Sequence, residues 1–535
     1  MKKFTKTALS LLVAAAFCGC SEIADLENIS DEESSSSVEE ESSLPVIYYD
    51  SEPQEFEVKK QDFVAKLNAE GGVFKNAEER NDGDFDGRGY VSFEQGGTLT
   101  HIVTPETSQH YRFVLAIRSE KGASVSLHIK DKTEGLFYIP PAGKDDDGNI
   151  SREFVYASVD CVYLSEGKNV FTLSVDKGVA EIDYIIVESS ENVDKSFYRT
   201  GTSAENPYAC LEVVGAMKYF SDIYGEYSLT AVNVSTGTNA EIDAIYGLTG
   251  RYPAIRTSEL SYAVLGNVEK EETLAKDIDL AIEWSKNGGL VSYKWHWYSP
   301  NRLRSVKTGA FDLVEAFKSV NIDDISVMTD EEISYLAKND YISSECYALI
   351  ADIDKLADTL AKLKNKDVVT IFEPLPNADS GLYWWGDDAE SYRKLYSLIF
   401  NRLCKYHKLT NLIFVYNGGN IAYYPGTEYC DIVGQSFFEK SNSAFAGRFS
   451  ALADALPTKK KLAVTSCDVL PSVDFMNRDN AVWLFCALER GKYVIDEYGA
   501  FSPEFNTAAA LKKAYNSTIM LTKDELPNLK MYAIH

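Results

Sequence analysis

Apolar and polar positions follow two different rhythms along the chain. From residue 47 to residue 190, short apolar runs recur between turns rich in Gly and Asp, with no convincing long helix. Beyond about residue 227, short apolar runs alternate with longer amphipathic stretches. The first rhythm is typical of an all-β sandwich, and the second of strands that alternate with helices. The sequence therefore predicts a multidomain protein, with a β-sandwich over residues 47–190 and a second domain over residues 200–535.

The second region contains enough strand signals for a closed barrel. Its amphipathic stretches at residues 276–285, 347–363 and 389–406 are predicted helices. Strands and helices in this alternation predict a (β/α)8 TIM barrel, in which chemistry lies at the carboxyl ends of the strands. The eight candidate strands are residues 229–234, 253–256, 290–295, 368–372, 412–416, 431–436, 462–465 and 482–487.

The front of the chain reads as an export signal. The first residues include several lysines, and an apolar run follows at residues 8–17. This run is shorter than the roughly 20 residues that a helix needs to span a bilayer. Gly19 before Cys20 resembles the cleavage box of bacterial lipoproteins. The resemblance implies a signal peptide over residues 1–19 and a lipid on Cys20; a plain secretory signal is the alternative. The Ser- and Glu-rich residues 20–46 are predicted to be a disordered tether.

Net charge and composition limit the classes of ligand that the chain is expected to bind. The 535-residue chain carries a formal charge of -28, which argues against nucleic acid and suits a neutral ligand such as a sugar. Its 33 Tyr, 26 Phe and 6 Trp would serve sugar stacking, although they serve ordinary cores equally well. The cysteines beyond the signal are scattered, so neither a disulfide framework nor a zinc site is predicted.

The β-sandwich region resembles the family 35 carbohydrate-binding modules, which have a jelly-roll fold. That resemblance implies a structural calcium held by Glu57 and Asp183, since calcium prefers carboxylate oxygens. Lys59 stands where the family has a second early glutamate, and both carboxylates read equally well as solvated strand ends. The segments that carry the resemblance are residues 87–91, 164–170 and 181–185.

Three motifs at predicted strand ends make the second region resemble glycoside hydrolase family 26, which contains β-mannanases and some other β-glucan and xylan hydrolases. The motifs are residues 292–300, 371–386 and 424–434. The resemblance covers nearly everything after residue 200. It implies a sugar site near the strand ends, whose expected contact residues are Trp295, His296, Trp297, Tyr383, Trp384, Trp385 and Trp483.

The same resemblance implies two catalytic glutamates about 5 Å apart for retaining hydrolysis, yet neither is present. The family's acid/base position is occupied by Asn377, and its nucleophile position after Thr465 by Ser466. Glu373 stands where the family has an arginine. An amide cannot donate and accept a proton near neutral pH, and we expect Ser466 to have no neighbouring base. Normal turnover is therefore not expected.

These observations lead to one hypothesis and two rivals. The leading hypothesis is a monomeric lipoprotein on the extracellular face of the cell membrane, held there only by its lipid. It would bind β-mannan or a related β-glycan as a pseudoenzyme and would require no cofactor. The first rival is an active endo-β-1,4-mannanase that uses displaced carboxylates, of which the candidates are Glu373, Asp379 and Asp468. The second rival is a barrel that serves as a scaffold for a protein partner.

Overall fold

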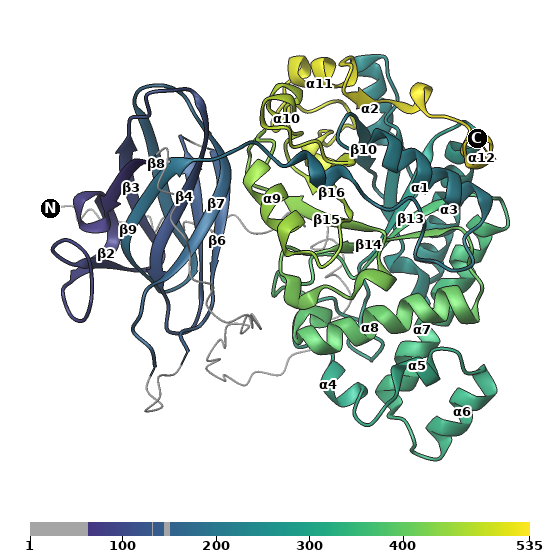
Figure 1. The fold of residues 1–535 in the computed structure, drawn as a ribbon. Helices are drawn as coiled ribbons and strands as arrows, with labels where there is room; N and C mark the ends of the chain where they lie inside the picture. The colour runs from purple at the N-terminus through teal and green to yellow at the C-terminus, as the bar shows by residue number, and fades with distance from the viewer. Residues whose placement is uncertain (1–62, 131, 144–149, 535) are drawn as a thin grey trace, which may run out of the picture.

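The structure, a computed structural model, describes residues 63–130, 132–143 and 150–534 (Figure 1). The predictions for the signal peptide, Cys20, the tether and Glu57 lie outside the described residues. Among the helices that are described, none has the length and apolar content needed to cross a bilayer.

The first folded region is an antiparallel β-domain with its own buried core (Figure 1). Its strands run in the order β6-β5-β8-β3-β9-β4-β7, with β1 beside β9 and β2 beside β3. Apolar runs of the sequence at residues 111–116, 124–129 and 170–175 lie within β4, β5 and β8. The bounds are β1 (Phe63–Asn68), β2 (Val73–Arg80), β3 (Tyr90–Val103), β4 (Gln109–Arg118), β5 (Ala123–Ile129), β6 (Lys132–Ile139), β7 (Val155–Leu164), β8 (Asn169–Gly178) and β9 (Ala180–Ser189).

One long strand turns this sheet around its core. The first part of β3 pairs with β9 at Val91 and Phe93, and its last part pairs with β8 from Thr98 onward. Between the two parts lies Gly96, whose φ of 80° is a conformation that glycine adopts at little cost. The bend lets both parts contribute to the same core, where Phe93 and Leu99 are both buried.

The second region is a closed parallel barrel, as predicted. Strands β10 through β17 are neighbours in chain order and the pairing of β10 with β11 closes the ring, while the short β18 (Met520–Leu521) lies outside β10. Each of the predicted strands overlaps one of these. The bounds are β10 (Ser228–Asn233), β11 (Ile255–Glu259), β12 (Leu290–Trp295), β13 (Thr370–Pro374), β14 (Leu412–Asn417), β15 (Ile432–Phe437), β16 (Lys461–Cys467) and β17 (Phe485–Leu488).

Helices cover the outside of the barrel (Figure 1). The main ones are α1 (Leu211–Ile223), α2 (Ala240–Thr249), α3 (Val268–Lys286), α7 (Ser344–Lys364), α8 (Ala389–Asn401), α9 (Ala446–Ala455), α10 (Val473–Asp479), α11 (Ala508–Tyr515) and α12 (Leu529–Ile534). Three short helices are inserted between β12 and α7, namely α4 (Leu313–Ala316), α5 (Ile322–Ile325) and α6 (Asp330–Lys338). The predicted helices at 276–285, 347–363 and 389–406 correspond to α3, α7 and α8, the last continued by a π-helical turn over Arg402–Tyr406.

Helix α7 shows why these stretches fold as they do. Ser343 caps its first turn by accepting a hydrogen bond from the Cys346 amide. Leu349, Ile353 and Leu356 recur at helical spacing and are all buried against the barrel. Burial of this apolar stripe, rather than helix propensity alone, stabilises so long an amphipathic helix.

The two domains are in direct contact, with β6 and β7 packed against α9 (Figure 1). A methyl group added at Gly447 of α9 would lie 2.8 Å from the Asp160 carbonyl oxygen, so only glycine allows this approach. Ser443 donates a hydrogen bond of 2.9 Å to Glu134 across the junction. The β-domain is therefore fixed to the side of the barrel.

Candidate functional site

Polar side chains gather at the carboxyl ends of the barrel strands. Because neighbouring strands are parallel, their carboxyl ends meet at one mouth of the barrel, where chemistry in this fold takes place. All of these side chains belong to residues that are buried or nearly so. They are Glu259 on β11, Lys294 on β12, Glu373 on β13, Asn417 on β14, Ser466 on β16 and Glu489 directly after β17.

Ser466, at the predicted nucleophile position, lies inside an ionic network. Its hydroxyl donates a 2.7 Å hydrogen bond to Glu489 and accepts one from the Lys294 ammonium. Asn233 lies 3.3 Å from the same hydroxyl oxygen and 3.2 Å from Glu489. Lys294 Nζ is 3.9 Å from Glu489 Oε2. The expectation that Ser466 lacks a neighbouring base is wrong, since the next barrel strand brings a carboxylate to it.

The network nevertheless does not make Ser466 a nucleophile. The ammonium of Lys294 and the amide of Asn233 both donate to the hydroxyl oxygen and so engage its two lone pairs, one of which would have to attack a substrate. The same positive charge lies 3.9 Å from Glu489, the carboxylate that accepts the hydrogen bond of the hydroxyl. Lys294, Ser466 and Glu489 therefore belong to one network of hydrogen bonds and an ion pair, which Asn233 completes.

Asn377, at the predicted acid/base position, lies in the loop directly after β13. Its φ of 53° falls in the left-handed region, which Asn adopts more readily than most residues. Its carbonyl oxygen accepts a 3.1 Å hydrogen bond from the Ser380 amide. The side chain is an amide, so it can donate and accept hydrogen bonds to a ligand but cannot transfer a proton to it.

Glu373 is the first of the three carboxylates considered as substitutes. Burial raises its pKa, although the nearby Lys294 charge and a hydrogen bond from Asn417 act in the opposite direction. Asn417 donates at 2.7 Å, and Thr465 Oγ1 lies 3.4 Å from the same oxygen. Glu373 also stands opposite Lys294 in the pairing of β12 with β13. It is thus a central carboxyl group with an increased tendency to hold a proton.

Asp379 and Asp468 are held by the backbone. Asp379 accepts hydrogen bonds of 2.8 Å and 2.7 Å from the amides of Gly419 and Asn420. Asp468 accepts from the amides of Lys440 and Val469, at 2.9 Å and 2.7 Å. Burial raises the pKa of both carboxyl groups. These contacts give both residues a structural role in fixing loops at the barrel mouth.

His296 is the predicted sugar contact that remains partly accessible, with 16% of its side chain exposed. Its Nδ1 forms a hydrogen bond with Glu259, whose other oxygen lies 3.4 Å from the His296 amide. Burial alone would raise the Glu259 pKa, but the charge and hydrogen bond of His296 outweigh it and lower that pKa. The ring of Tyr383 lies 5.4 Å from the imidazole.

The predicted indoles are packed into the protein rather than presented to a ligand. Trp295, Trp297, Trp384, Trp385 and Trp483 are all 0% exposed, and Tyr383 is 4% exposed. Trp297 stacks on Trp295 with ring centroids 4.2 Å apart, and Tyr383 stacks on Trp385 at 4.4 Å. None of these predicted contact rings is therefore exposed on the surface, because each is covered by its neighbours.

Trp483 is also placed differently from the prediction. The predicted strand over residues 482–487 includes Trp483, but β17 begins at Phe485, so Trp483 precedes the strand. Its indole donates a 2.9 Å hydrogen bond to the Ala444 carbonyl and packs 5.0 Å from the ring of Phe449 on α9. It anchors the loop before α9.

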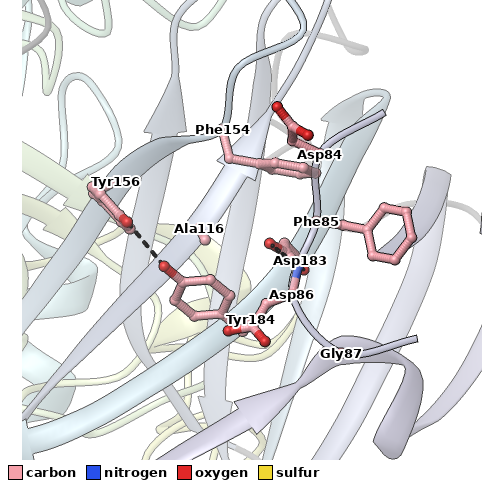
Figure 2. A pocket seen from close by; sticks show the side chains of 9 residues that line it. All are labelled: Asp84, Phe85, Asp86, Gly87, Ala116, Phe154, Tyr156, Asp183 and Tyr184. Carbon is pink, nitrogen blue, oxygen red and sulfur yellow. Dashed lines mark hydrogen bonds between the residues drawn. The ribbon is translucent and has the colours of Figure 1, made fainter. Parts of the chain in front are cut away.

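The β-domain has a pocket of its own, with a volume of about 440 Å³ (Figure 2). Asp183 lies in it and accepts hydrogen bonds of 3.0 Å and 3.1 Å from the Asp86 amide. Burial raises the Asp183 pKa to about 6. The hydroxyls of Tyr156 and Tyr184 are 2.9 Å apart across its floor. The lining residues are Asp84, Phe85, Asp86, Gly87, Ala116, Phe154, Tyr156, Asp183 and Tyr184.

Calcium at Asp183 stays a prediction. Within the described ranges, no group of three or more His, Cys, Asp or Glu side chains is arranged to hold a metal ion. The second proposed ligand, Glu57, lies outside those ranges. The carboxylate of Asp183 is engaged with a backbone amide, and Asp86 beside it forms an ion pair with Lys66.

Several central residues were not singled out from the sequence. All lie at or directly after the end of a strand in the structure and within three residues of the end of a predicted strand, namely Glu259, Lys294, Asn417 and Glu489. The rule that barrel chemistry lies at strand ends could have identified them. Gln435 on β15 belongs to the same set, but it carries no charge and no recognisable motif.

The fold and the site together define the class. A closed (β/α)8 barrel with ionisable side chains at the carboxyl ends of its strands has the architecture of a TIM-barrel enzyme. Residues 206–525 match glycosyl hydrolase family 26. The chain belongs to that family, which confirms the resemblance seen in the sequence.

Characterised relatives and solved structures resemble both domains. The chain is 26% identical over 450 residues to mannan endo-1,4-beta-mannosidase of Thermothelomyces thermophilus, covering 83% of this chain and 86% of that protein. It is 24% identical over 459 residues to mannan endo-1,4-beta-mannosidase B of Piromyces sp, covering 84% of this chain and 74% of that protein. The crystal structure of the Podospora anserina GH26-CBM35 beta-(1,4)-mannanase has a TM-score of 0.53 at 23% identity, covering 88% of this chain and 100% of that chain. The crystal structure of a ruminal GH26 endo-beta-1,4-mannanase has a TM-score of 0.57 at 22% identity, covering 88% of this chain and 99% of that chain. These structural likenesses show the fold.

Proposed function

We propose that this chain binds β-mannan or a related β-glycan through a family 26 barrel that does not hydrolyse it. Its relatives are named as mannan endo-1,4-beta-mannosidases, which supports the ligand class. One observation carries the loss of hydrolysis. Asn377 and Ser466 occupy the two expected acid positions, and the hydroxyl of Ser466 is bound by Lys294 and Glu489.

The magnitudes favour binding over turnover. Loss of positioned acid–base help alone costs about 10²–10⁴ in rate. Loss of the nucleophile also removes the covalent intermediate of retaining hydrolysis. Ground-state hydrogen bonding and packing against a sugar do not depend on either acid. A site with this composition would keep its affinity while its hydrolytic rate falls.

The setting of this activity is part of the proposal. The charged start, the apolar run and Gly19-Cys20 support a lipoprotein on the extracellular face of the cell membrane. The β-domain would be a jelly-roll carbohydrate-binding module of the family 35 kind, with a structural calcium at Glu57 and Asp183. The acidic tether would let both domains reach polysaccharide near the surface.

Electrophoresis of the full-length protein through gels with and without β-mannan tests binding, and a reducing-end assay tests hydrolysis. We expect retardation by mannan and no release of reducing ends. Retardation by no polysaccharide would favour the scaffold role for the barrel. Release of reducing ends by the unaltered protein would refute the pseudoenzyme.

Reconstruction of the acids sharpens this test. In Asn377→Glu with Ser466→Glu, the new carboxylate at 466 would lie beside Lys294 and form an ion pair with it. We therefore expect little hydrolysis from the double variant and more once Lys294→Ser is added. A triple variant that binds mannan but stays inactive would show that more than these residues separates the site from an enzyme.

A second function has one observation in its favour. Glu373 has a raised pKa, as a general acid needs, and Glu489 lies 2.7 Å from the nucleophile position. Together they could serve as displaced acids in an active mannanase. In that case the unaltered protein would hydrolyse mannan. Glu373→Gln and Glu489→Gln would each abolish this hydrolysis, while Asp468→Asn would not.

A further inference from the structure

The β-domain reaches the mouth of the barrel through β6. Residues two apart on a strand share a face, so Tyr138 lies on the same face as Glu134, which contacts Ser443 of the barrel. Further along that face, Tyr138 forms a hydrogen bond with Arg448 of α9 and contributes to raising the Arg448 pKa. Tyr138 is thus a β-domain residue in contact with the barrel.

Three polar side chains from different elements converge at Gly419. A methyl group placed there would lie 3.2 Å from Gln435 Nε2, 3.4 Å from the Tyr138 hydroxyl and 3.5 Å from Asp379 Oδ2. Gly419 is two residues beyond Asn417, which bonds to Glu373 at the barrel centre. The convergence therefore lies at the rim of the barrel mouth, on the side of the β-domain.

Two acceptors at this rim have no donor. Gln435 Oε1 and Glu439 Oε2 are buried, and no group among the described residues donates a hydrogen bond to either atom. The other oxygen of Glu439 is paired with Arg448, which also contacts Tyr138. A buried acceptor without a donor costs about 1–3 kcal/mol, and such atoms call for a donor from water or a ligand.

We propose that this rim is a glycan subsite shared by the two domains, with Gln435 and Glu439 accepting hydroxyl groups of one sugar unit and Tyr138 forming its β-domain wall. This inference rests on the proposed glycan binding. Hydroxyl groups supply the missing donors. A uronic acid unit would bring a carboxylate close to Glu439 and Asp379, so the subsite selects neutral sugars.

The position of the subsite makes binding depend on ligand length. A glycan that occupies the barrel centre near Asn377 must extend toward Gly419 before it reaches Tyr138. Short oligosaccharides would occupy the centre alone, whereas longer ones would gain the rim contacts. The β-domain would then contribute directly to the barrel's affinity, in addition to any site of its own.

Calorimetric titration of the full-length protein with β-1,4-linked manno-oligosaccharides of increasing length tests this. Gln435→Met removes the acceptor at nearly constant size, and we expect about tenfold weaker binding of long oligosaccharides with short ones unchanged. Tyr138→Ala should have the same length-dependent effect. Because Gln435→Met removes a buried group that lacks a donor, it should not lower the unfolding temperature.

Two controls separate the subsite from domain docking and from the proposed function. Ser443→Ala breaks the Glu134 contact at the junction and should leave the length dependence intact. Tyr156→Phe alters only the β-domain pocket of Figure 2 and should also leave the dependence of affinity on oligosaccharide length intact. If the unaltered protein binds no oligosaccharide, the proposed function itself fails. If it binds them and both rim variants match it at every length, the subsite alone is refuted.

Discussion

Replacement of Lys294 by methionine would test the ionic network at the centre of the barrel. The ammonium donates to Ser466, lies 3.9 Å from Glu489 and stands opposite Glu373 in the adjacent strand. The side chains of Lys294 and Glu489 are only 9% and 13% exposed. Methionine keeps the length of the chain but removes the charge, which leaves Glu489 with Arg490, 3.9 Å from its other oxygen, as its remaining ionic partner.

The expected loss follows from that burial. Removal of one partner from a buried ion pair costs about 3–5 kcal/mol, because the remaining charge stays desolvated. At roughly 2 °C or more per kcal/mol, the unfolding temperature of the barrel should fall by at least about 5 °C. Burial raises the Glu373 pKa, so lowering the pH protonates this carboxylate and the deficit should shrink there.

Thermal and urea unfolding of Lys294→Met, Glu489→Gln and the double variant measure this coupling. We expect the double variant to recover part of the loss, since it removes both charges. Lys513→Met is the matched control, because Lys513 pairs with Asp474 at the surface and such pairs contribute about 0–1 kcal/mol. If Lys294→Met is no more damaging than Lys513→Met, the network does not hold the barrel centre together and our reasoning is refuted.

Three further predictions concern packing and pH. Trp384→Ala should destabilise the barrel by about 3–5 kcal/mol, because the indole is fully buried; loss of glycan binding without loss of stability would contradict this. Gly447→Val should separate the β-domain from α9, since its side chain would clash with Val159 and the backbone, and limited proteolysis would detect the freed domain. Burial raises the Glu134 pKa to about 7 from 4.5, so the folded state binds this proton more tightly and docking stability should fall as pH rises through about 7. Glu134→Gln should flatten that pH dependence in calorimetric scans.

The sequence was most informative where local pattern determines structure. The barrel strands and the helices α3, α7 and α8 were predicted because apolar periodicity follows directly from which face is buried. The strand ends near His296 and Glu373 followed from the same pattern. The family was also readable, since its motifs are short and continuous in the chain.

The predictions were weakest for side chains whose role depends on distant neighbours. An indole has the same sequence signal whether it stacks on a sugar or fills a core, and Trp384 and Trp385 turned out to be buried. For Ser466, the sequence predicts no neighbouring base. Its partners Lys294 and Glu489 come from two other strands of the barrel.

The amino-acid sequence by itself determined the order of the elements and the family, because each is a property of consecutive residues; the replacement of both catalytic glutamates stays a prediction. Only the tertiary structure decided which charges compensate one another at the barrel mouth, which indoles are covered, and that Tyr138 of the β-domain stands beside Gly419. The reason is physical: closure of the ring and docking of the β-domain bring together residues hundreds of positions apart, and burial then sets their contacts and their pKa values.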